Sequence, residues 1–182
     1  MDADGGPVGA GVSGELLARG PMVAAGYFRQ EQLTAQHFMS DGFFRTGDQA
    51  RMDADGYVKI TGRIKDLIVR GGVNIAPAEI ESILFGHPKI ADVAVVGVPD
   101  ERLGERVCAV VIPRAGGPPS LAEVQAWMAR AGAAKQKWPE RVKQTDAFPM
   151  TPSGKIQKFR LRQIIAERVA AETVADPAGD RS

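Results

Sequence analysis

Charged residues stand beside glycines at several places between residues 41 and 74 of this 182-residue sequence. Asp48 follows Gly47, Arg63 follows Gly62, and a Gly71–Gly72 pair comes shortly afterwards. Glycine allows backbone conformations that other residues avoid, and it lets a ligand approach the backbone closely. A carboxylate accepts hydrogen bonds from two neighbouring hydroxyls, and a planar guanidinium holds an oxygen anion while it stays charged. Asp48 and Arg63 are therefore candidate contacts for a ligand rich in hydroxyl and phosphate groups.

A fourth candidate is Lys155, which ends the segment Pro149–Lys155, PMTPSGK. Pro152 and Gly154 are expected to hold this loop, from which a long cationic side chain projects. The Gly-Lys pair lacks the earlier glycine of a phosphate-binding P-loop. Each candidate also has an ordinary interpretation: Lys155 as a solvated lysine, Asp48 as a turn aspartate, and Arg63 as a surface arginine that pairs with an aspartate.

The remaining reactive side chains predict little chemistry. Cys108 lies in the apolar run 107–112, which favours a buried strand residue over a nucleophile. His37 and His87 are isolated, without acidic or cysteine neighbours at ligand spacing, so we predict no metal site built by the protein.

Composition restricts the class of protein further. A hydrophobic content of 44% and a charged content of 25% are those of an ordinary globular chain. The net charge of +1 gives no electrostatic reason to expect binding to nucleic acid or to an anionic membrane. The beginning of the sequence lacks a secretory pattern, and no apolar run approaches the roughly 20 residues that span a bilayer. We expect a cytoplasmic location.

The first half of the chain predicts short strands. Strand-like runs at 49–52 and 57–61 flank Asp53–Gly56, which is the clearest hairpin in the sequence. A helical turn or two is expected within 31–38. Another short strand at 67–69 is turned by Gly71–Gly72.

The second half predicts an α+β core. Pro77 suits the first position of a helix, and buried strands are expected at 91–96 and 107–112. Ser120 and Glu123 form a capping-box pattern before another helix. A last helix, about 158–171, should bury Leu161, Ile164 and Ile165.

These elements divide near residues 63–66. Residues 1–62 carry short strands and too few apolar runs for a good core of their own, so they should be the edge of something larger. Residues 67–171 supply a short mixed sheet flanked by helices, and the polar tail 172–182 should be disordered.

Three ordered motifs, FRTGD, GRIKDLIVRGGVNIAPAEIE and PMTPSGKIQK, together resemble the carboxyl-terminal part of the acyl-adenylate-forming enzymes. The resemblance runs from about Gly14 to about Ile165. It is nearest to a fatty-acid or alicyclic-acid CoA ligase. It implies that residues 1–62 are the end of a large AMP-binding domain, 63–66 a hinge, and 67–171 the whole small domain.

The resemblance also implies roles for the candidates. Asp48 and Arg63 match the residues that bind the ribose of ATP or AMP. Lys155 matches the lysine that bridges the carboxylate substrate and the α-phosphate during adenylation, where a fixed cation stabilises the transition state. Lys65 occupies the hinge position, at which the small domain turns relative to the large one.

For the acceptor thiol, the resemblance implies that Gly71, Gly72 and Asn74 line the tunnel for the pantetheine arm of CoA. Magnesium would arrive with ATP, held mainly by its phosphates. A basic group begins the last helix, and we interpret it as a solvated face, with contact to CoA phosphates as the less favoured alternative; it comprises Lys158, Arg160 and Arg162.

The serine/threonine- and glycine-rich phosphate loop of the family is absent from this sequence, as is its aromatic motif with threonine and glutamate. We therefore expect the carboxyl-terminal part of an AMP-forming acid–CoA ligase, incomplete and inactive alone. Two alternatives stay open: part of a carrier-protein-loading adenylation enzyme, and a non-enzymatic truncated or docking subunit.

Overall fold

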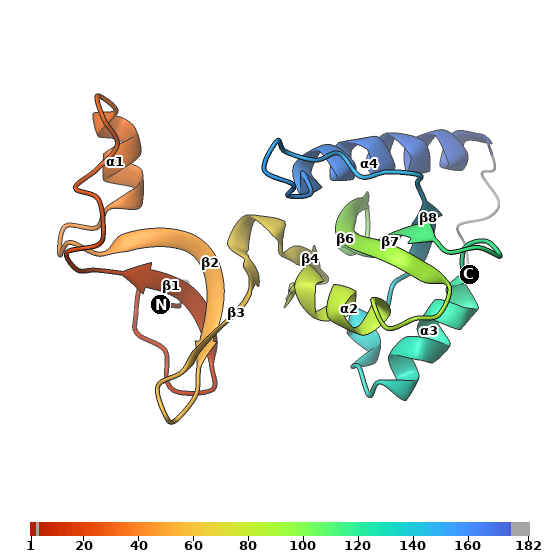
Figure 1. The fold of residues 1–182 in the computed structure, drawn as a ribbon, viewed down its shortest axis with the longest axis horizontal. Helices are drawn as coiled ribbons and strands as arrows, with labels where there is room; N and C mark the ends of the chain where they lie inside the picture. Colours follow the sequence, from red (N-terminus) through yellow and green to blue (C-terminus); the bar gives the residue numbers. More distant parts are fainter. Residues whose placement is uncertain (3, 176–182) are drawn as a thin grey trace. The chain divides into compact units, whose positions relative to one another are not determined.

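The computed structural model describes residues 1–2 and 4–175, with side chains described as far as 172. The chain divides into two compact units, residues 1–65 and residues 66 onward (Figure 1). Of the predicted disordered tail, residues 172–175 are helical, and 176–182 lie outside the described residues.

The first unit is a three-stranded antiparallel sheet with one short helix. Its strands, in the order β1-β2-β3, are β1 (Ser13–Ala18), β2 (Phe44–Met52) and β3 (Val58–Arg63), and its helix is α1 (Glu31–His37). The predicted hairpin is confirmed. The Asp53 carboxylate accepts hydrogen bonds from the backbone N–H groups of Asp55 (3.0 Å) and Tyr57 (2.9 Å), and Gly56 takes the positive φ of 87° that closes the turn.

This unit has almost no core. Among its described residues, Ala50 alone is classed as buried, while Met52, Val58 and Ile60 are 47%, 51% and 58% exposed. Val58 and Ile60 are two residues apart on β3 and therefore share one face of the sheet. That face exposes adjacent apolar side chains, which is unusual for a stable isolated sheet.

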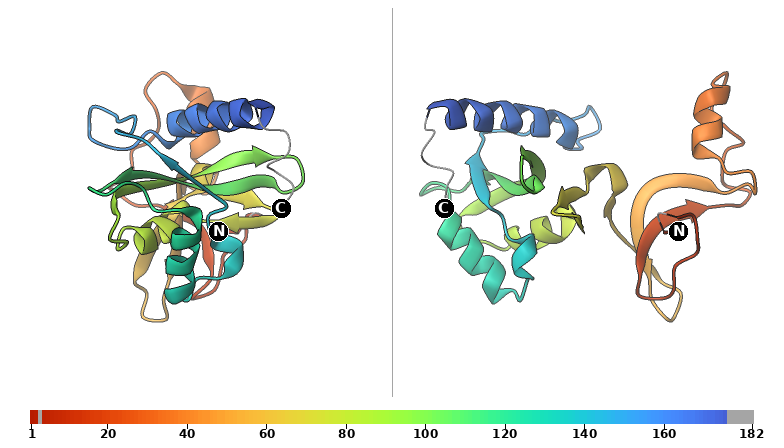
Figure 2. Two further views of the ribbon diagram at one scale, coloured as in Figure 1. Left: turned by 90° about the vertical axis from the view of Figure 1, so that its right-hand side faces the viewer. Right: turned by 180° about the vertical axis from the view of Figure 1, so that it is seen from behind.

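The second unit is a five-stranded mixed sheet between two layers of helix (Figure 2). The strand order is β5-β4-β7-β6, and β8 pairs with β7 in parallel while the other pairs are antiparallel. Its strands are β4 (Ile68–Arg70), β5 (Val73–Ile75), β6 (Ile90–Asp100), β7 (Gly104–Pro113) and β8 (Arg141–Gln144). Its helices are α2 (Pro77–Leu84), α3 (Leu121–Arg130) and α4 (Lys158–Ala175), with 3-10 turns at Ile64–Asp66, which crosses the division, and Lys135–Lys137.

Two apolar clusters hold these layers together. Alternate residues of β7 face opposite sides of the sheet, so Val107, Ala109 and Val111 pack with α2 and α3, and Cys108 and Val110 pack with α4. All five are fully buried. The predicted α+β class and mixed sheet are therefore confirmed, and no helix in the described part of the chain is long and apolar enough to cross a bilayer.

Several details differ from the sequence prediction, among them the following. Ile164 is 39% exposed, and the buried stripe of α4 is instead Leu161, Ile165 and Val169. The helix continues to Ala175 rather than ending near 171. Strand β8 was not predicted at all.

Candidate functional site

Asp48 and Arg63 face each other across the first unit's sheet. They are register partners on β2 and β3, and Arg63 Nε lies 2.7 Å from Asp48 Oδ1. Arg63 Nη1 also donates to the Thr46 carbonyl (3.3 Å), and the Thr46 hydroxyl accepts from the Asp48 N–H (3.0 Å). The structure thus brings two predicted site residues together as an ion pair. This agrees with the ordinary interpretation of Arg63 and also presents an acceptor and a donor side by side.

Lys155 projects from a small hairpin closed by Thr151. The Thr151 N–H donates to the Lys155 carbonyl (2.8 Å), and the Lys155 N–H donates to the Thr151 hydroxyl (3.0 Å). Gly154 adopts a positive φ of 77°, and Met150 and Ile156 form an isolated bridge below the turn. Lys155 is exposed, and no ion-pair partner for its amino group lies in the described part of the chain. A defined backbone therefore carries an uncommitted cation.

The β4–β5 hairpin turns at the two predicted glycines. Gly71 and Gly72 have φ values of 55° and 80°, so the turn interpretation is confirmed. A Cβ at Gly72 would meet nothing within 4 Å, which leaves this side of the turn bare. Val69 and Val73 beside it are 48% and 39% exposed, and Asn74 is exposed. The hairpin offers an apolar strip next to unprotected backbone.

Lys65 lies in the 3-10 turn Ile64–Asp66, and the division between the two compact units falls directly after it. Its side chain is exposed. A polar residue can keep its hydration at such a place, which suits a segment whose backbone angles change.

Neither the cysteine nor the histidines form a reactive centre. Cys108 is fully buried, and burial raises the pKa of its thiol to about 12, so it stays protonated. His87 is 5% exposed and packs edge-on against Trp127 at 5.0 Å. His37 packs among Tyr27 and Phe44. Within residues 1–2 and 4–175, no group of three or more His, Cys, Asp or Glu side chains could hold a metal ion.

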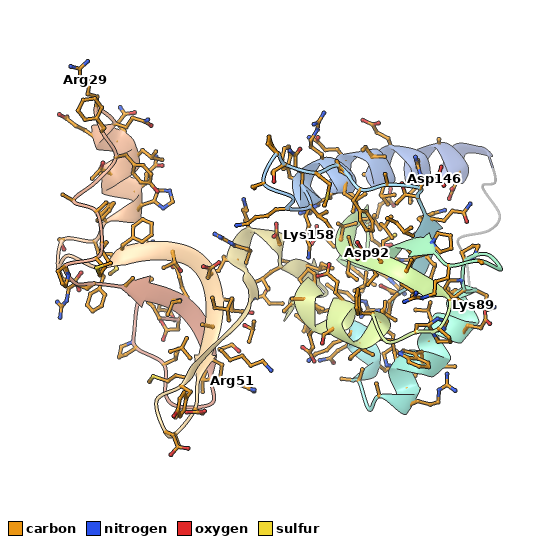
Figure 3. The ribbon with its side chains drawn as sticks, in the orientation of Figure 1. Arg29, Arg51, Lys89, Asp92, Asp146 and Lys158 are labelled. Carbon is orange, nitrogen blue, oxygen red and sulfur yellow. The ribbon has the colours of Figure 1, made fainter. Side chains whose placement is uncertain are left out.

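The basic start of α4 is largely engaged in ion pairs. Lys158, labelled in Figure 3, lies with its Nζ 2.6 Å from Glu81 Oε1, and Arg162 pairs with Glu105. Arg160 donates to Gln157 Oε1 at 3.4 Å. Two of the three cations therefore already have carboxylate partners, which weakens the case for a phosphate-binding patch.

Two buried or half-buried carboxylates, Glu105 and Glu140, were not predicted as important. Each binds a partner 33 or more residues away in sequence. The only sequence signal is the position of Glu105 at the start of an otherwise apolar strand.

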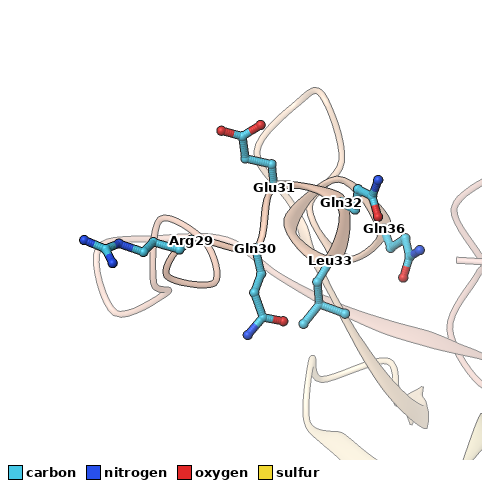
Figure 4. Close-up of a pocket in the computed structure, with 6 residues that line it drawn as sticks. All are labelled: Arg29, Gln30, Glu31, Gln32, Leu33 and Gln36. Carbon is cyan, nitrogen blue, oxygen red and sulfur yellow. The ribbon is translucent and has the colours of Figure 1, made fainter.

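A surface hollow along α1 carries no comparable chemistry (Figure 4). Its six lining side chains diverge from one another in the close-up, and none converges on a common point. They are Arg29, Gln30, Glu31, Gln32, Leu33 and Gln36.

Comparison with known proteins gives the family. Residues 79–155 match the model of the AMP-binding enzyme C-terminal domain family. The chain is 50% identical over 163 residues, 89% of its length, to the medium-chain fatty-acid–CoA ligase of Escherichia coli (strain K12). It is 44% identical over 161 residues, 88% of its length, to the 2,3-dihydroxybenzoate-AMP ligase of Bacillus subtilis (strain 168).

Solved structures agree with this match. ATP-bound MatB from Rhodopseudomonas palustris superimposes with a TM-score of 0.81 at 38% identity, and apo MatB with 0.64 at 39% identity. Each comparison covers 88% of this chain and 32% of MatB. The chain belongs to the acyl-adenylate-forming, AMP-binding superfamily, whose carboxyl-terminal portion it matches. It spans 29% and 30% of the length of the two curated relatives named above.

Proposed function

We propose that this chain is the carboxyl-terminal part of an AMP-forming acid–CoA ligase. The observation that carries the proposal is Lys155, an exposed and uncommitted cation on a hairpin whose backbone Thr151 fixes. Lys155 has no ion-pair partner among the described residues and is held on a defined turn, so it is suited to meet an anionic ligand that approaches from outside the second unit.

In the first proposed step, a carboxylate oxygen of the acid attacks the α-phosphorus of ATP. The bond to the bridging oxygen breaks, and pyrophosphate leaves with the electron pair. Lys155 would stabilise the negative charge on the attacking carboxylate and on the phosphoryl oxygens. Asp48 would accept hydrogen bonds from the ribose hydroxyls, with Arg63 holding the carboxylate in place and donating to a ribose oxygen.

In the second proposed step, the CoA thiol loses its proton to solvent and the sulfur attacks the acyl carbon. The bond between the acyl carbon and the phosphate oxygen breaks, and AMP leaves with the electron pair on that oxygen. The bare turn at Gly71–Gly72 would let the narrow pantetheine arm run along the backbone. Rotation of the second unit about Lys65 would withdraw Lys155 from the adenylate and bring the Gly71–Gly72 hairpin to it.

The proposed cofactors are ATP with Mg²⁺, and CoA. The donor set fits the sugar of a nucleotide, whereas the described residues include no acidic cluster that would hold the magnesium ion itself. The sequence has no phosphate loop, so we propose that the 182-residue chain is inactive without a partner domain. The matching fatty-acid ligase favours a fatty acid as substrate. A reducing compartment such as the cytoplasm suits the single buried thiol of Cys108.

The test uses the chain alone and a chimera that joins it to the preceding residues of the E. coli ligase. The chain alone should show no ATP–pyrophosphate exchange. In the chimera, Lys155→Ala should lower that exchange on the order of 10²- to 10³-fold, while thioester formation from supplied acyl-AMP persists. Lys135→Ala, another exposed lysine, is the matched control and should change neither step. Equal loss of both steps in Lys155→Ala would contradict the assignment.

A second candidate function is loading of a carrier protein, which supplies a protein-bound thiol in place of free CoA. It is supported by the 44% identity to an aryl-AMP ligase. Steady-state rates with CoA and with a carrier protein as acceptor distinguish the two, because the preferred thiol gives the larger kcat/KM.

A further inference from the structure

The β4–β5 hairpin has little backbone attachment to the sheet that carries it. Strand β4 contains three residues, and its pairing with β7 consists of one register pair, Arg70 with Gly104. The Gly71 N–H adds one hydrogen bond to the Leu103 carbonyl at 2.7 Å. Since the proposed thiol channel lies at the tip of this hairpin, side-chain contacts must contribute to fixing its position.

The Glu105 carboxylate supplies one such contact. Glu105 is 8% exposed, and its Oε2 accepts a hydrogen bond from the Val69 N–H of β4 at 2.8 Å. The carboxylate lies over Gly97 in β6, where an added Cβ would stand only 2.8 Å from its carbon and oxygen. A glycine within the valine-rich strand β6 therefore leaves the room that this side chain occupies.

The Glu105 carboxylate also contacts helix α4. Arg162 of α4 forms an ion pair with Glu105 Oε1. A buried carboxylate is tolerated only when it is paired and hydrogen-bonded, so this contact holds the beginning of α4 against the sheet. That beginning is tied in turn to the Lys155 hairpin, because Gln157 donates its N–H to the Pro149 carbonyl (2.8 Å) and its Nε2 to the Met150 carbonyl (3.2 Å).

Glu140 provides an independent anchor for the β4–β5 hairpin alone. Its two oxygens accept from Arg70 Nε (3.0 Å) and Arg70 Nη2 (2.8 Å), and Oε2 also accepts from the Val107 N–H (3.3 Å). Glu140 precedes β8, and in the described part of the chain its carboxylate hydrogen-bonds to β4 and β7. A change at Glu140 should therefore affect one of the two motifs that Glu105 joins.

We propose that Glu105 is a positioning residue that fixes the glycine hairpin and the Lys155 hairpin to β7 as one rigid body. The inference rests on the proposed function, in which one unit presents two motifs in turn. The proposed rotation of the second unit about Lys65 brings each hairpin to the reaction in turn. It can place both correctly only if the distance between the glycine hairpin and the Lys155 hairpin stays constant. In this proposal Glu105 acts through β4 and α4 rather than on the reacting atoms.

Three variants separate this role from general destabilisation, measured in the chimera described above. Glu105→Gln keeps the acceptor for Val69 but loses the charge that pairs with Arg162, and it should lower the rates of both half-reactions by about tenfold, through loss of one partly buried ion pair. Arg162→Gln should lower adenylation more than thioester formation. Glu140→Gln should raise the KM for CoA and spare ATP–pyrophosphate exchange.

The matched control is Glu79→Gln on α2, which removes an exposed ion pair with Lys137 of the 3-10 turn (2.7 Å) and should change neither half-reaction. An equal fall of both rates in Arg162→Gln and in Glu140→Gln would overturn the proposal, because that pattern indicates loss of folded protein.

A second measurement on the 182-residue chain does not depend on activity. Amide hydrogen exchange should speed up about tenfold at Val69, Gly71 and Lys155 in Glu105→Gln, and not in Glu79→Gln. Unchanged exchange at these amides would overturn the positioning role, even if the chimera catalyses both steps. A wild-type chimera without activity would refute the proposed function, and the exchange result would still decide whether Glu105 joins the two hairpins.

Discussion

At the scale of single residues, His87 is a buried side chain whose charge affects stability near neutral pH. It is 5% exposed, and its Nδ1 accepts the Lys89 N–H at 3.2 Å. Burial lowers the pKa of His87, opposed by Glu123 and reinforced by Lys89 and Arg130. The folded protein therefore binds this proton less readily than the unfolded chain does.

The sign of the pH dependence follows from this difference. The contribution of His87 to the free energy of unfolding is complete above its ordinary pKa of about 6.5 and declines as the pH falls below it, by at most about 1.4 kcal/mol per pH unit. Urea unfolding at pH 7.5, 6.5 and 5.5 measures this slope. His87→Gln, which retains an acceptor for the Lys89 N–H, should flatten the curve. An unchanged slope in that variant would assign the dependence to other groups.

Sequence patterns predicted single residues well where the cause is local. Buried Cys108 follows from an apolar run, and the glycine turn at 71–72 follows from backbone freedom. Ile164 was placed wrongly because helical spacing allows both i+3 and i+4 from Leu161, and only packing on the sheet selects the i+4 stripe through Ile165. The roles of Asp48, Arg63, Lys65 and Lys155 remain proposals; the structure gives their placement, not their ligands.

At the scale of elements, the capping box of α3 gives a prediction with a defined geometry. Ser120 Oγ accepts the Glu123 N–H at 3.2 Å, and Glu123 Oε2 accepts the Ser120 N–H at 2.8 Å. Ser120→Ala removes the first of these bonds and should lower the free energy of unfolding by about 1 kcal/mol. Chemical denaturation measures the change. Ser120→Asn, another good N-cap residue, should stay close to wild type, and equal losses in both variants would argue against capping.

Elements were predictable when their signal was continuous in sequence. The capping box and the Asp53–Gly56 turn are short motifs, so α3 and the β2–β3 hairpin were located correctly. Strand β8 carries the polar sequence RVKQ, and only its parallel pairing with β7 makes it a strand. Strands β6 and β7 extend beyond their apolar centres because Asp100 pairs with Arg106 (2.5 Å) and accepts the Leu103 N–H (2.8 Å) at their shared turn.

At the scale of the whole molecule, the two units differ in what can stabilise them. The second unit contains both apolar clusters, whereas the described part of the first unit buries Ala50 alone. A small sheet without a covered face gains too little burial to offset the entropy of ordering its backbone. Cooperative folding should therefore reside in residues 66 onward.

This difference predicts the behaviour of separated segments. Residues 66–182 should unfold cooperatively in urea with a midpoint close to that of the full chain, because they retain every residue of both clusters. Residues 1–65 alone should give no cooperative transition and little chemical-shift dispersion. A monomeric 1–65 segment with a sharp transition would show that its sheet needs no partner. That result would also count against the proposal that these strands complete a larger nucleotide-binding domain, since a self-sufficient sheet has no apolar face that must be covered.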